Sequence, residues 1–281
     1  MVHEYSRSQR AFALVGPGRA GTTVAVALAA RGWLPTAVAG RRIDAPSTLR
    51  VAELLGAPAV EVVDAGRVAE LVIVATPDTV IAETAAALAP RVQPGALVIH
   101  LSGACELEEL AKLSTARPDV EIGSLHPLQS LPTVELGVER LPGSWCAVDG
   151  PPAVERLAIS LGLRPFRVDP LQRARYHAAA TVAANHLVAL LAQATQLAES
   201  AGVPPAALLP LVRATVDNVE VLGARGALTG PVARGDADTA ARHLDALAPE
   251  ERAAYRALAT EALRLSGRDD AALRTLLEDD S

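Results

Sequence analysis

The stretch Phe12-Ala-Leu-Val-Gly-Pro-Gly-Arg-Ala-Gly21 decides the fold of this 281-residue chain. It begins within Ala11–Val15, an apolar run of strand length, and ends inside the segment from Arg19 to Arg31, which is predicted to be a helix. Between the two lie three glycines with the spacing G-x-G-x-x-G: Gly16, Gly18 and Gly21. A strand, a glycine-rich turn and a helix in this order are typical of a turn that binds a dinucleotide.

Each glycine of such a turn has its own role. The first allows a tight turn out of the strand, the second lets the backbone approach a pyrophosphate, and the third lets the helix pack on the strand. The helix N-terminus adds free N–H groups and the positive end of the helix dipole. We therefore predict a cofactor-binding turn made of Gly16, Pro17, Gly18, Arg19, Ala20 and Gly21. The alternative is an ordinary tight turn between a strand and a helix.

The composition is that of a globular protein and argues against a nucleic-acid partner. Half of the residues are apolar, only 2% are aromatic, and the formal net charge is −6. The two cysteines, Cys105 and Cys146, form neither a disulfide framework nor a metal-ligand pattern. We expect a cytoplasmic protein without a metal site.

We expect no membrane segment. Residues 1–10 are polar and charged, unlike a signal peptide. The longest apolar stretch, Ala178–Ala192, contains Asn185 and His186 and is too short to span a bilayer. We expect this stretch to form a buried helix.

Strand and helix patterns alternate in the first 169 residues, which predicts a mostly parallel sheet with right-handed crossovers. After the first strand, further strands are predicted at Thr36–Ala39, Val60–Val63, Leu71–Ala75, Ala96–Leu101, Glu121–Leu125, Trp145–Asp149 and Phe166–Asp169. Beyond them only helices are predicted, at Leu171–Ala201, Ala206–Leu222, Ala237–Leu247 and Pro249–Leu265. The predicted fold is α/β, with a doubly wound Rossmann domain over residues 10–169 and an all-α domain over residues 170–281.

The end of the second strand is where such domains choose between two nicotinamide cofactors. An acidic residue there would bind the ribose 2′-hydroxyl of NAD, whereas arginine accommodates the 2′-phosphate of NADP. Gly40 occupies this position and is followed by Arg41 and Arg42, whereas Asp44 lies further on and is interpreted as a helix cap. The pattern favours NADP, and a solvated arginine pair on a loop is the alternative.

The next two strand ends face the crevice in which a ligand lies in a doubly wound sheet. Thr76 and Pro77 are candidates to line the cofactor, and Asp78 is expected to cap the following helix. Ser102 and Gly103 follow the next strand, where a hydroxyl and free N–H groups can bind a carboxylate or the nicotinamide amide. Turn chemistry alone is the alternative for these residues.

The start of the long helix carries the candidate catalytic groups. His177, Thr181 and Asn185 are spaced i, i+4 and i+8, which places them on one stripe of a helix that is otherwise apolar. A buried polar group without a partner costs about 1–3 kcal/mol, so the stripe needs an explanation. We hypothesise that His177 is a general acid and that Asn185 orients the substrate. A hydrogen-bonded structural histidine is the alternative.

Other polar residues have less specific predictions. His126 follows a strand and is expected to border the substrate crevice, together with Ser102. His100 is interpreted as a satisfied core histidine and His186 as a packing or interface residue. In Leu228–Asp236, Arg234 and Asp236 are expected to cap helices, with Arg234 as an alternative contact for an anionic substrate.

Five motifs together resemble those of the Rossmann-like oxidoreductases whose C-terminal part is catalogued as domain of unknown function 2520. The motifs are Gly16-Pro-Gly-Arg-Ala-Gly21, His100-Leu-Ser-Gly103, Ser124-Leu-His-Pro-Leu-Gln129, Tyr176-His-Ala-Ala-Ala180 with Asn185, and Leu228-Thr-Gly-Pro-Val-Ala-Arg-Gly-Asp236. The plan is that of the 6-phosphogluconate dehydrogenase-like superfamily, with ketopantoate reductase, pyrroline-5-carboxylate reductase, the β-hydroxyacid dehydrogenases and F420-dependent NADP reductase as more distant kin. In ketopantoate reductase and the β-hydroxyacid dehydrogenases, a lysine and an asparagine act from the corresponding helix, whereas this chain has His177 in the equivalent place.

The resemblance implies an NADP-linked oxidoreductase, and we expect reduction of a C=O or C=N bond in a small acid-like metabolite. The nicotinamide supplies the hydride, and the protein orients the reactants and moves one proton. F420 as electron partner and an NADP-binding sensor without turnover are the alternatives. We also expect a homodimer, because the apolar helix has more apolar surface than a slim helical domain readily buries.

Overall fold

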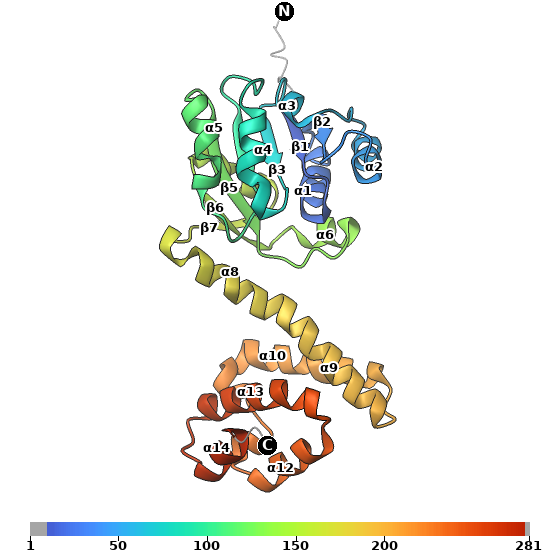
Figure 1. The fold of residues 1–281 in the computed structure, drawn as a ribbon, viewed down its shortest axis with the longest axis vertical. Helices are drawn as coiled ribbons and strands as arrows, with labels where there is room; N and C mark the ends of the chain where they lie inside the picture. The colour runs from blue at the N-terminus through green and yellow to red at the C-terminus, as the bar shows by residue number, and fades with distance from the viewer. Residues whose placement is uncertain (1–9, 279–281) are drawn as a thin grey trace, which may run out of the picture. The chain divides into compact units, whose positions relative to one another are not determined.

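The computed structural model describes residues 10–278. The chain divides into two compact units, Met1–Asn185 and His186–Ser281. The first contains a sheet with helices on both faces, and the second is helical (Figure 1). This architecture confirms the predicted fold class.

The sheet has the strand order β2-β1-β3-β4-β5-β6-β7. Its strands are β1 (Ala11–Val15), β2 (Leu34–Ala39), β3 (Leu71–Val74), β4 (Leu97–His100), β5 (Glu121–Pro127), β6 (Trp145–Asp149) and β7 (Arg164–Phe166). Neighbouring strands are parallel except β5 and β6, which are antiparallel. The carboxyl ends of β1 to β5 therefore share one edge of the sheet, where ligands bind in folds of this kind.

Both faces of the sheet are buried, because alternate side chains of each strand enter one of two apolar clusters. Phe12 and Leu14 pack in one cluster, whereas Ala13 and Val15 pack in the other. The first cluster is covered by α1 (Arg19–Ala29), α2 (Pro46–Leu55) and α7 (Pro152–Ser160). The second is covered by α3 (Val62–Ala65), α4 (Ile81–Leu88) and α5 (Ala111–Ala116), and α6 (Val134–Arg140) packs beside α1. Burial on both sides explains why β1 and β3 are continuous apolar runs.

The predicted strand Val60–Val63 is wrong. Only Ala59 forms a bridge, with Val38 of β2, before the chain turns into the short helix α3. A strand here would lie at the sheet edge with one partner, and the local bond from the Asp64 N–H to the Glu61 carbonyl begins a helix instead. The sheet consequently ends at β2.

The long helix is interrupted by a change in its winding. After a 3₁₀ turn at Pro170–Gln172, α8 (Arg173–Thr181) passes through a π-helical turn, Val182–His186, into α9 (Leu187–Ser200). The strands end at Phe166 and the helical part begins at Pro170, but the two compact units divide within this π turn. The domain boundary at residue 170 stays a prediction.

The second unit has its own small core. It consists of α9, α10 (Leu208–Ala227), α11 (Pro231–Arg234), α12 (Ala237–Ala246), α13 (Pro249–Ser266) and α14 (Ala271–Glu278). The buried apolar residues are Val232, Ala240, Ala259, Leu263, Leu273 and Leu277. Asp236 caps α12 by accepting a hydrogen bond from the Thr239 N–H at 3.0 Å, which is the structural role predicted for it.

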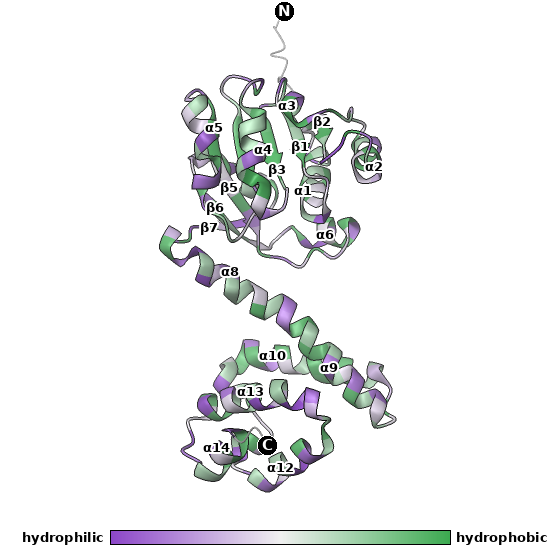
Figure 2. Ribbon diagram, viewed as in Figure 1, coloured by the Kyte–Doolittle hydropathy of each residue, from purple (hydrophilic) through white to green (hydrophobic). Residues whose placement is uncertain are grey.

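The prediction that Ala178–Ala192 is buried is wrong for the single chain. Val182, Leu187, Val188 and Leu190 are exposed, and α10 exposes further apolar residues. Figure 2 shows hydrophobic residues along both α9 and α10. By length and composition alone, the helix Pro170–Ser200 is also long and apolar enough to cross a membrane. These apolar residues are exposed because the small core of the second unit covers little of α9 and α10.

Candidate functional site

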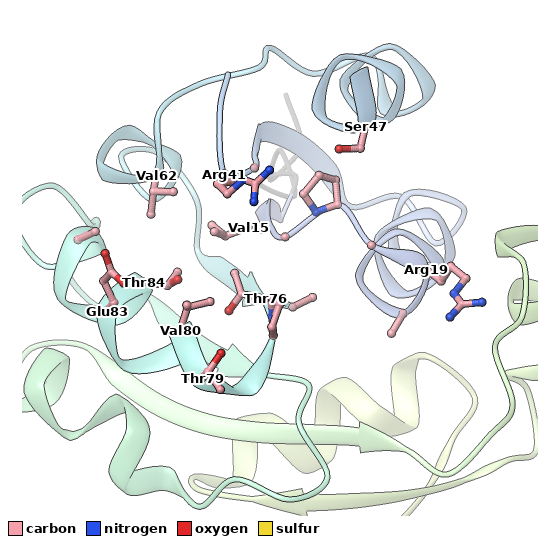
Figure 3. Close-up of a pocket in the computed structure, with 18 of the residues that line it drawn as sticks. Val15, Arg19, Arg41, Ser47, Val62, Thr76, Thr79, Val80, Glu83 and Thr84 are labelled. Carbon is pink, nitrogen blue, oxygen red and sulfur yellow. The ribbon is translucent and has the colours of Figure 1, made fainter. Parts of the chain in front are cut away.

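A cavity of about 1090 Å³ opens where β1, β2 and β3 end. The glycine-rich turn and Arg19 border it on one side (Figure 3). Arg41, Ser47 and Val62 form another wall, opposite Thr76, Thr79, Val80, Glu83 and Thr84. The cavity lies within the first compact unit.

The surroundings of the three glycines of the turn fit the roles predicted for them. Gly16 has φ +93°, and a Cβ there would lie 2.5 Å from the carbonyl carbon of Ala75. A Cβ on Gly21 would lie 2.6 Å from the Cβ of Ala75, so this glycine lets α1 pack against the end of β3. A Cβ on Gly18 would meet nothing within 4 Å, so the space beside Gly18 is open to a ligand.

The cavity has two unsatisfied features that suit a phosphorylated ligand. Helix α1 begins after Gly18, without a side chain that caps its first N–H groups and without an acidic residue in its first turn. Its positive end is therefore free to bind an anion. The Oγ1 atom of Thr76 is buried without a hydrogen-bond partner among residues 10–278. A pyrophosphate at the helix end and a polar group beside Thr76 fit these residues.

The structure separates the two arginines that follow β2. Arg41 lines the cavity, whereas Arg42 is bound to Asp44 by two hydrogen bonds, Nε to Oδ1 at 2.9 Å and Nη2 to Oδ2 at 2.6 Å. Asp44 is therefore not the predicted helix cap, and the hydrogen bond from Arg42 lowers its pKa. The helix α2 begins after Ala45 without a side-chain cap.

Gly40 is required by close packing. A Cβ on Gly40 would lie 2.1 Å from the Oγ1 of Thr48, which itself donates a hydrogen bond to the Arg42 carbonyl. An acidic side chain that would bind a ribose 2′-hydroxyl has no room here. Ser47, in the first turn of α2, faces the same cavity as Arg41 and was not predicted from the sequence.

The remaining predicted cofactor residues differ in their positions. Pro77 lines the cavity with Thr76, but Asp78 does not line it and caps neither the 3₁₀ turn Asp78–Val80 nor α4. Ser102 accepts hydrogen bonds from the N–H groups of Ala104 and Cys105, which is the turn role given as its alternative. Neither Ser102 nor Gly103 lines the cavity.

A second polar group lies at the carboxyl end of β5. The Nδ1 atom of His126 is 2.7 Å from the hydroxyl of Tyr176 on α8. The ring of His177 packs edge-to-face on His126, with 6.0 Å between the ring centroids. The structure therefore brings together two predicted residues, His126 and His177, and adds Tyr176.

Arg173 attaches the start of α8 to the sheet. Its Nη2 donates to the Ser102 carbonyl at 3.2 Å and to the Ser124 hydroxyl at 2.8 Å, and its Nη1 lies 4.0 Å from Oδ2 of Asp149. The side chain is only 3% exposed. This arginine joins the ends of β4, β5 and β6 to the helix and was missed because its partners are distant in the sequence.

His100 is a core residue, but it is not satisfied as predicted. It is fully buried, and neither ring nitrogen has a hydrogen-bond partner within residues 10–278. Burial, and then the charge of Arg173, lower its pKa to about 4. His100 is therefore neutral in the folded protein at pH 7.

The free energy of unfolding is expected to fall in mild acid because of His100. In the unfolded chain His100 binds a proton below its ordinary pKa of 6.5, whereas in the folded chain it stays neutral down to about pH 4. The contribution of His100 to the free energy of unfolding therefore falls by about 2 kcal/mol from pH 7.5 to pH 5. This loss is measured by urea unfolding of the wild type and of His100→Gln at both pH values. The variant should lose about 2 kcal/mol less than the wild type. Equal pH dependence would contradict the prediction, and the exposed His186→Gln is the control.

Asn185 is not aligned with His177 as the sequence predicted. It lies in the π turn, where each turn contains about one more residue than in an α-helix, so the i, i+4, i+8 stripe does not continue to it. Its side chain is exposed, as is that of His186. The role of Asn185 in orienting a substrate stays a prediction.

Two family models match the chain. Residues 4–127 match a Rossmann-like domain, and residues 146–262 match the domain of unknown function DUF2520. The chain is thus a Rossmann-like protein with a C-terminal DUF2520 domain, which confirms the family that its motifs resemble. No curated protein matches the chain.

Solved structures share the fold over nearly the whole chain. BF3122 from Bacteroides fragilis, for which an NADP oxidoreductase activity is suggested, has 23% identity and a TM-score of 0.74, over 96% of this chain and 99% of that one. Protein TM1727 from Thermotoga maritima has 25% identity and a TM-score of 0.63, over 95% and 98%. A reductive aminase from Aspergillus terreus in complex with NADPH and ethyl-5-oxohexanoate has 18% identity and a TM-score of 0.58, over 96% and 91%.

Proposed function

We propose that this protein is an NADP(H)-dependent oxidoreductase that reduces a C=O or C=N bond of a small acid-like metabolite. The main observation behind the proposal is the cavity at the carboxyl end of β1. It is lined by Arg41 and by Gly18, beside which there is open space. The names of BF3122 and of the fungal reductive aminase, which are similar in fold, support the same cofactor and reaction type.

The residues have distinct proposed roles toward the cofactor. The N–H groups at the start of α1 bind the pyrophosphate, and Arg41 with Ser47 binds the 2′-phosphate. Thr76 offers its unpartnered hydroxyl to the bound nucleotide. When bound, the nicotinamide supplies the hydride, and the protein moves the proton.

Calorimetric titration with NADPH and NADH side by side tests the cofactor assignment. We expect NADPH to bind at least tenfold more tightly, because Arg41 is free to pair with a 2′-phosphate and Gly40 offers no carboxylate to a ribose. Binding of neither nucleotide would refute the proposed function, and a preference for NADH would refute the role of Arg41. Oxidation of bound NADPH by a panel of carbonyl and imine compounds, with oxidised F420 included, then tests the reaction.

We also propose that the protein is a cytoplasmic homodimer in which a second copy covers the apolar faces of α9 and α10. Six strongly exposed residues support this: Val188 on α9 and Leu209, Leu211, Val216, Val221 and Leu222 on α10. Burial of such side chains contributes roughly 1.5–3 kcal/mol each, which favours self-association over exposure.

Val188→Glu is expected to convert the dimer to a monomer. Val188 is 68% exposed in the single chain, and a carboxylate there would have to be desolvated in the dimer. Val68→Glu is the matched control, because Val68 is 62% exposed and lies in the first unit. Light scattering after gel filtration should give twice the chain mass for the wild type and the control. A dimeric Val188→Glu protein, or a monomeric wild type, would contradict this interface.

A further inference from the structure

Aromatic residues are rare in this chain, yet they gather at one place. Only seven residues are Phe, Trp or Tyr. Three of them, Trp145, Phe166 and Tyr176, form a row of edge-to-face contacts that continues to His126, with centroid distances of 6.1, 5.7 and 5.7 Å. The row ends at the same edge of the sheet as the cofactor cavity.

Contacts on both residues fix the hydrogen bond between His126 and Tyr176. A Cβ on Gly103 would lie 2.6–2.8 Å from three atoms of the His126 ring, so the backbone after β4 packs directly on the imidazole. Arg173, three residues before Tyr176, fixes the start of α8 to Ser102 and Ser124. The 2.7 Å contact between Nδ1 and the hydroxyl is thus set by the fold.

Both members of the pair are neutral near pH 7. Burial, then the charges of His177 and Arg173, lower the pKa of His126 to about 4, with a smaller decrease from His100 and an opposing effect of Asp78. Burial, and then Cys146, raise the pKa of Tyr176 to about 12, and Arg173 lowers it slightly. A neutral imidazole and a neutral phenol share one hydrogen bond in either of two arrangements.

The two arrangements differ in which hydrogen is free. If Nδ1 accepts the phenolic hydrogen, the hydroxyl has no proton left to donate. If the imidazole carries its hydrogen on Nδ1 and donates it to the tyrosine oxygen, the phenolic hydrogen is free to bind a second acceptor. Tyr176 is half-buried, so such an acceptor can come from the solvent side.

We propose that Tyr176 is the proton donor of the reduction and that His126, carrying its hydrogen on Nδ1, is its positioning residue. The inference rests on the proposed function. The carbon of the C=O or C=N bond receives a hydride, and the electron pair of the π bond moves to the oxygen or nitrogen. That atom takes the hydroxyl proton of Tyr176, and the tyrosine oxygen takes the Nδ1 proton of His126. A water molecule gives a proton to Nε2 and leaves as hydroxide, and exchange of the ring hydrogen with solvent then restores the Nδ1–H form.

The position of the pair along the sheet fits this role. The end of β3, with Ala75 and Thr76, lines the cavity, and His126 ends β5, with β4 as the strand between them. Neighbouring strands are about 4.8 Å apart, so the pair lies about 10 Å from the cavity wall along the edge. The pair and the proposed cofactor site therefore lie at the same edge of the sheet.

Tyr176 fits the role of donor better than its neighbour His177. Within residues 10–278, His177 makes no side-chain hydrogen bond, and only its ring contact with His126 orients it. Tyr176 has both a hydrogen-bond partner and a packed ring on either side. The hypothesis that His177 is the general acid is therefore tested in the same experiment.

Tyr176→Phe removes the hydroxyl and keeps the ring that packs on Phe166. The chain offers a matched control, because Tyr255 also binds a histidine, His243, through Nδ1 at 2.9 Å, with ring centroids 5.9 Å apart. Tyr255 lies in the second unit, and Tyr255→Phe should change nothing at the site. His177→Gln completes the set.

Imidazole ¹⁵N NMR at pH 7 gives a readout that needs no substrate. The His126 signals, assigned with His126→Gln, should show the Nδ1–H tautomer in the wild type and in Tyr255→Phe, and they should change in Tyr176→Phe. A wild-type His126 with its hydrogen on Nε2 would overturn the proposal, because the phenolic hydrogen would then be used in the bond to Nδ1.

Turnover is measured as NADPH oxidation with glyoxylate, pyruvate and 1-pyrroline as probes. Tyr176→Phe should lower kcat at least 100-fold with an unchanged Kd for NADPH, whereas the control Tyr255→Phe stays within threefold. His177→Gln, whose ring contacts His126, should lower kcat less than Tyr176→Phe does. A Tyr176→Phe rate within threefold of the wild type, or a 100-fold loss in His177→Gln alone, overturns the role of Tyr176. A wild type that binds NADPH but reduces no probe counts against the proposed function itself and removes the proposal with it.

Discussion

Gly16→Ala is expected to lower the free energy of unfolding by about 3 kcal/mol and to abolish NADPH binding. An L-residue at φ +93° is strained by about 1–3 kcal/mol, and the added Cβ would lie 2.5 Å from the backbone of Ala75. Backbone cannot move away as a flexible side chain does, so the end of β3 must shift. Because Ala75 and Thr76 also line the cavity, the same shift distorts the cofactor site.

Gly18→Ala separates the loss of stability from the loss of NADPH binding, which Gly16→Ala is expected to cause together. A Cβ at position 18 meets no atom within 4 Å, and Gly18 has an extended backbone that any residue adopts. Its unfolding free energy should stay within about 1 kcal/mol of the wild type, since Gly18 precedes the helix interior. Its affinity for NADPH should fall at least tenfold, because the methyl group occupies the space proposed for the pyrophosphate. Urea unfolding measures the stability of both variants, and calorimetry measures their affinity for NADPH. A stable Gly16→Ala protein that binds NADPH would contradict the assignment of the turn.

The parts of the fold that sequence analysis found are those determined by neighbouring residues. The turn from Gly16 to Gly21 was predicted because a strand, a turn and a helix follow one another within about 20 residues, and each glycine has a local reason. Val60–Val63 has the composition of a strand, but an edge strand also needs a partner along its whole length. That condition depends on how the chain leaves β2, which composition does not specify.

The candidate catalytic residues could be predicted only in part, because their contacts join residues that are distant in the sequence. His126 was predicted as a crevice residue from its place after a strand, but its partner Tyr176 lies 50 residues further on. Arg173 was missed because its partners Ser102 and Ser124 come from two other strands. The stripe of His177, Thr181 and Asn185 assumed a regular α-helix, and the π turn at Val182–His186 ends that regularity.

Arg41→Gln is expected to weaken NADPH binding about 10–100-fold and to leave the affinity for NADH within threefold. A hydrogen bond to a charged group contributes about 1.5–3 kcal/mol, which corresponds to this range of affinity. Within residues 10–278, Arg41 has no ion-pair partner, and it lines the cavity together with Ser47. The loss should therefore fall on the cofactor that carries a 2′-phosphate.

Arg42→Gln is the matched control for this substitution. Arg42 has the same charge and is adjacent in the sequence, but both ends of its guanidinium bind Asp44. Its removal should change NADPH affinity less than threefold, because its guanidinium is bound to Asp44 and does not line the cavity. If the two variants lost affinity equally, the 2′-phosphate would be recognised by the net charge of the loop. A tenfold loss confined to Arg41→Gln would instead show that the position of one guanidinium in the cavity selects the cofactor.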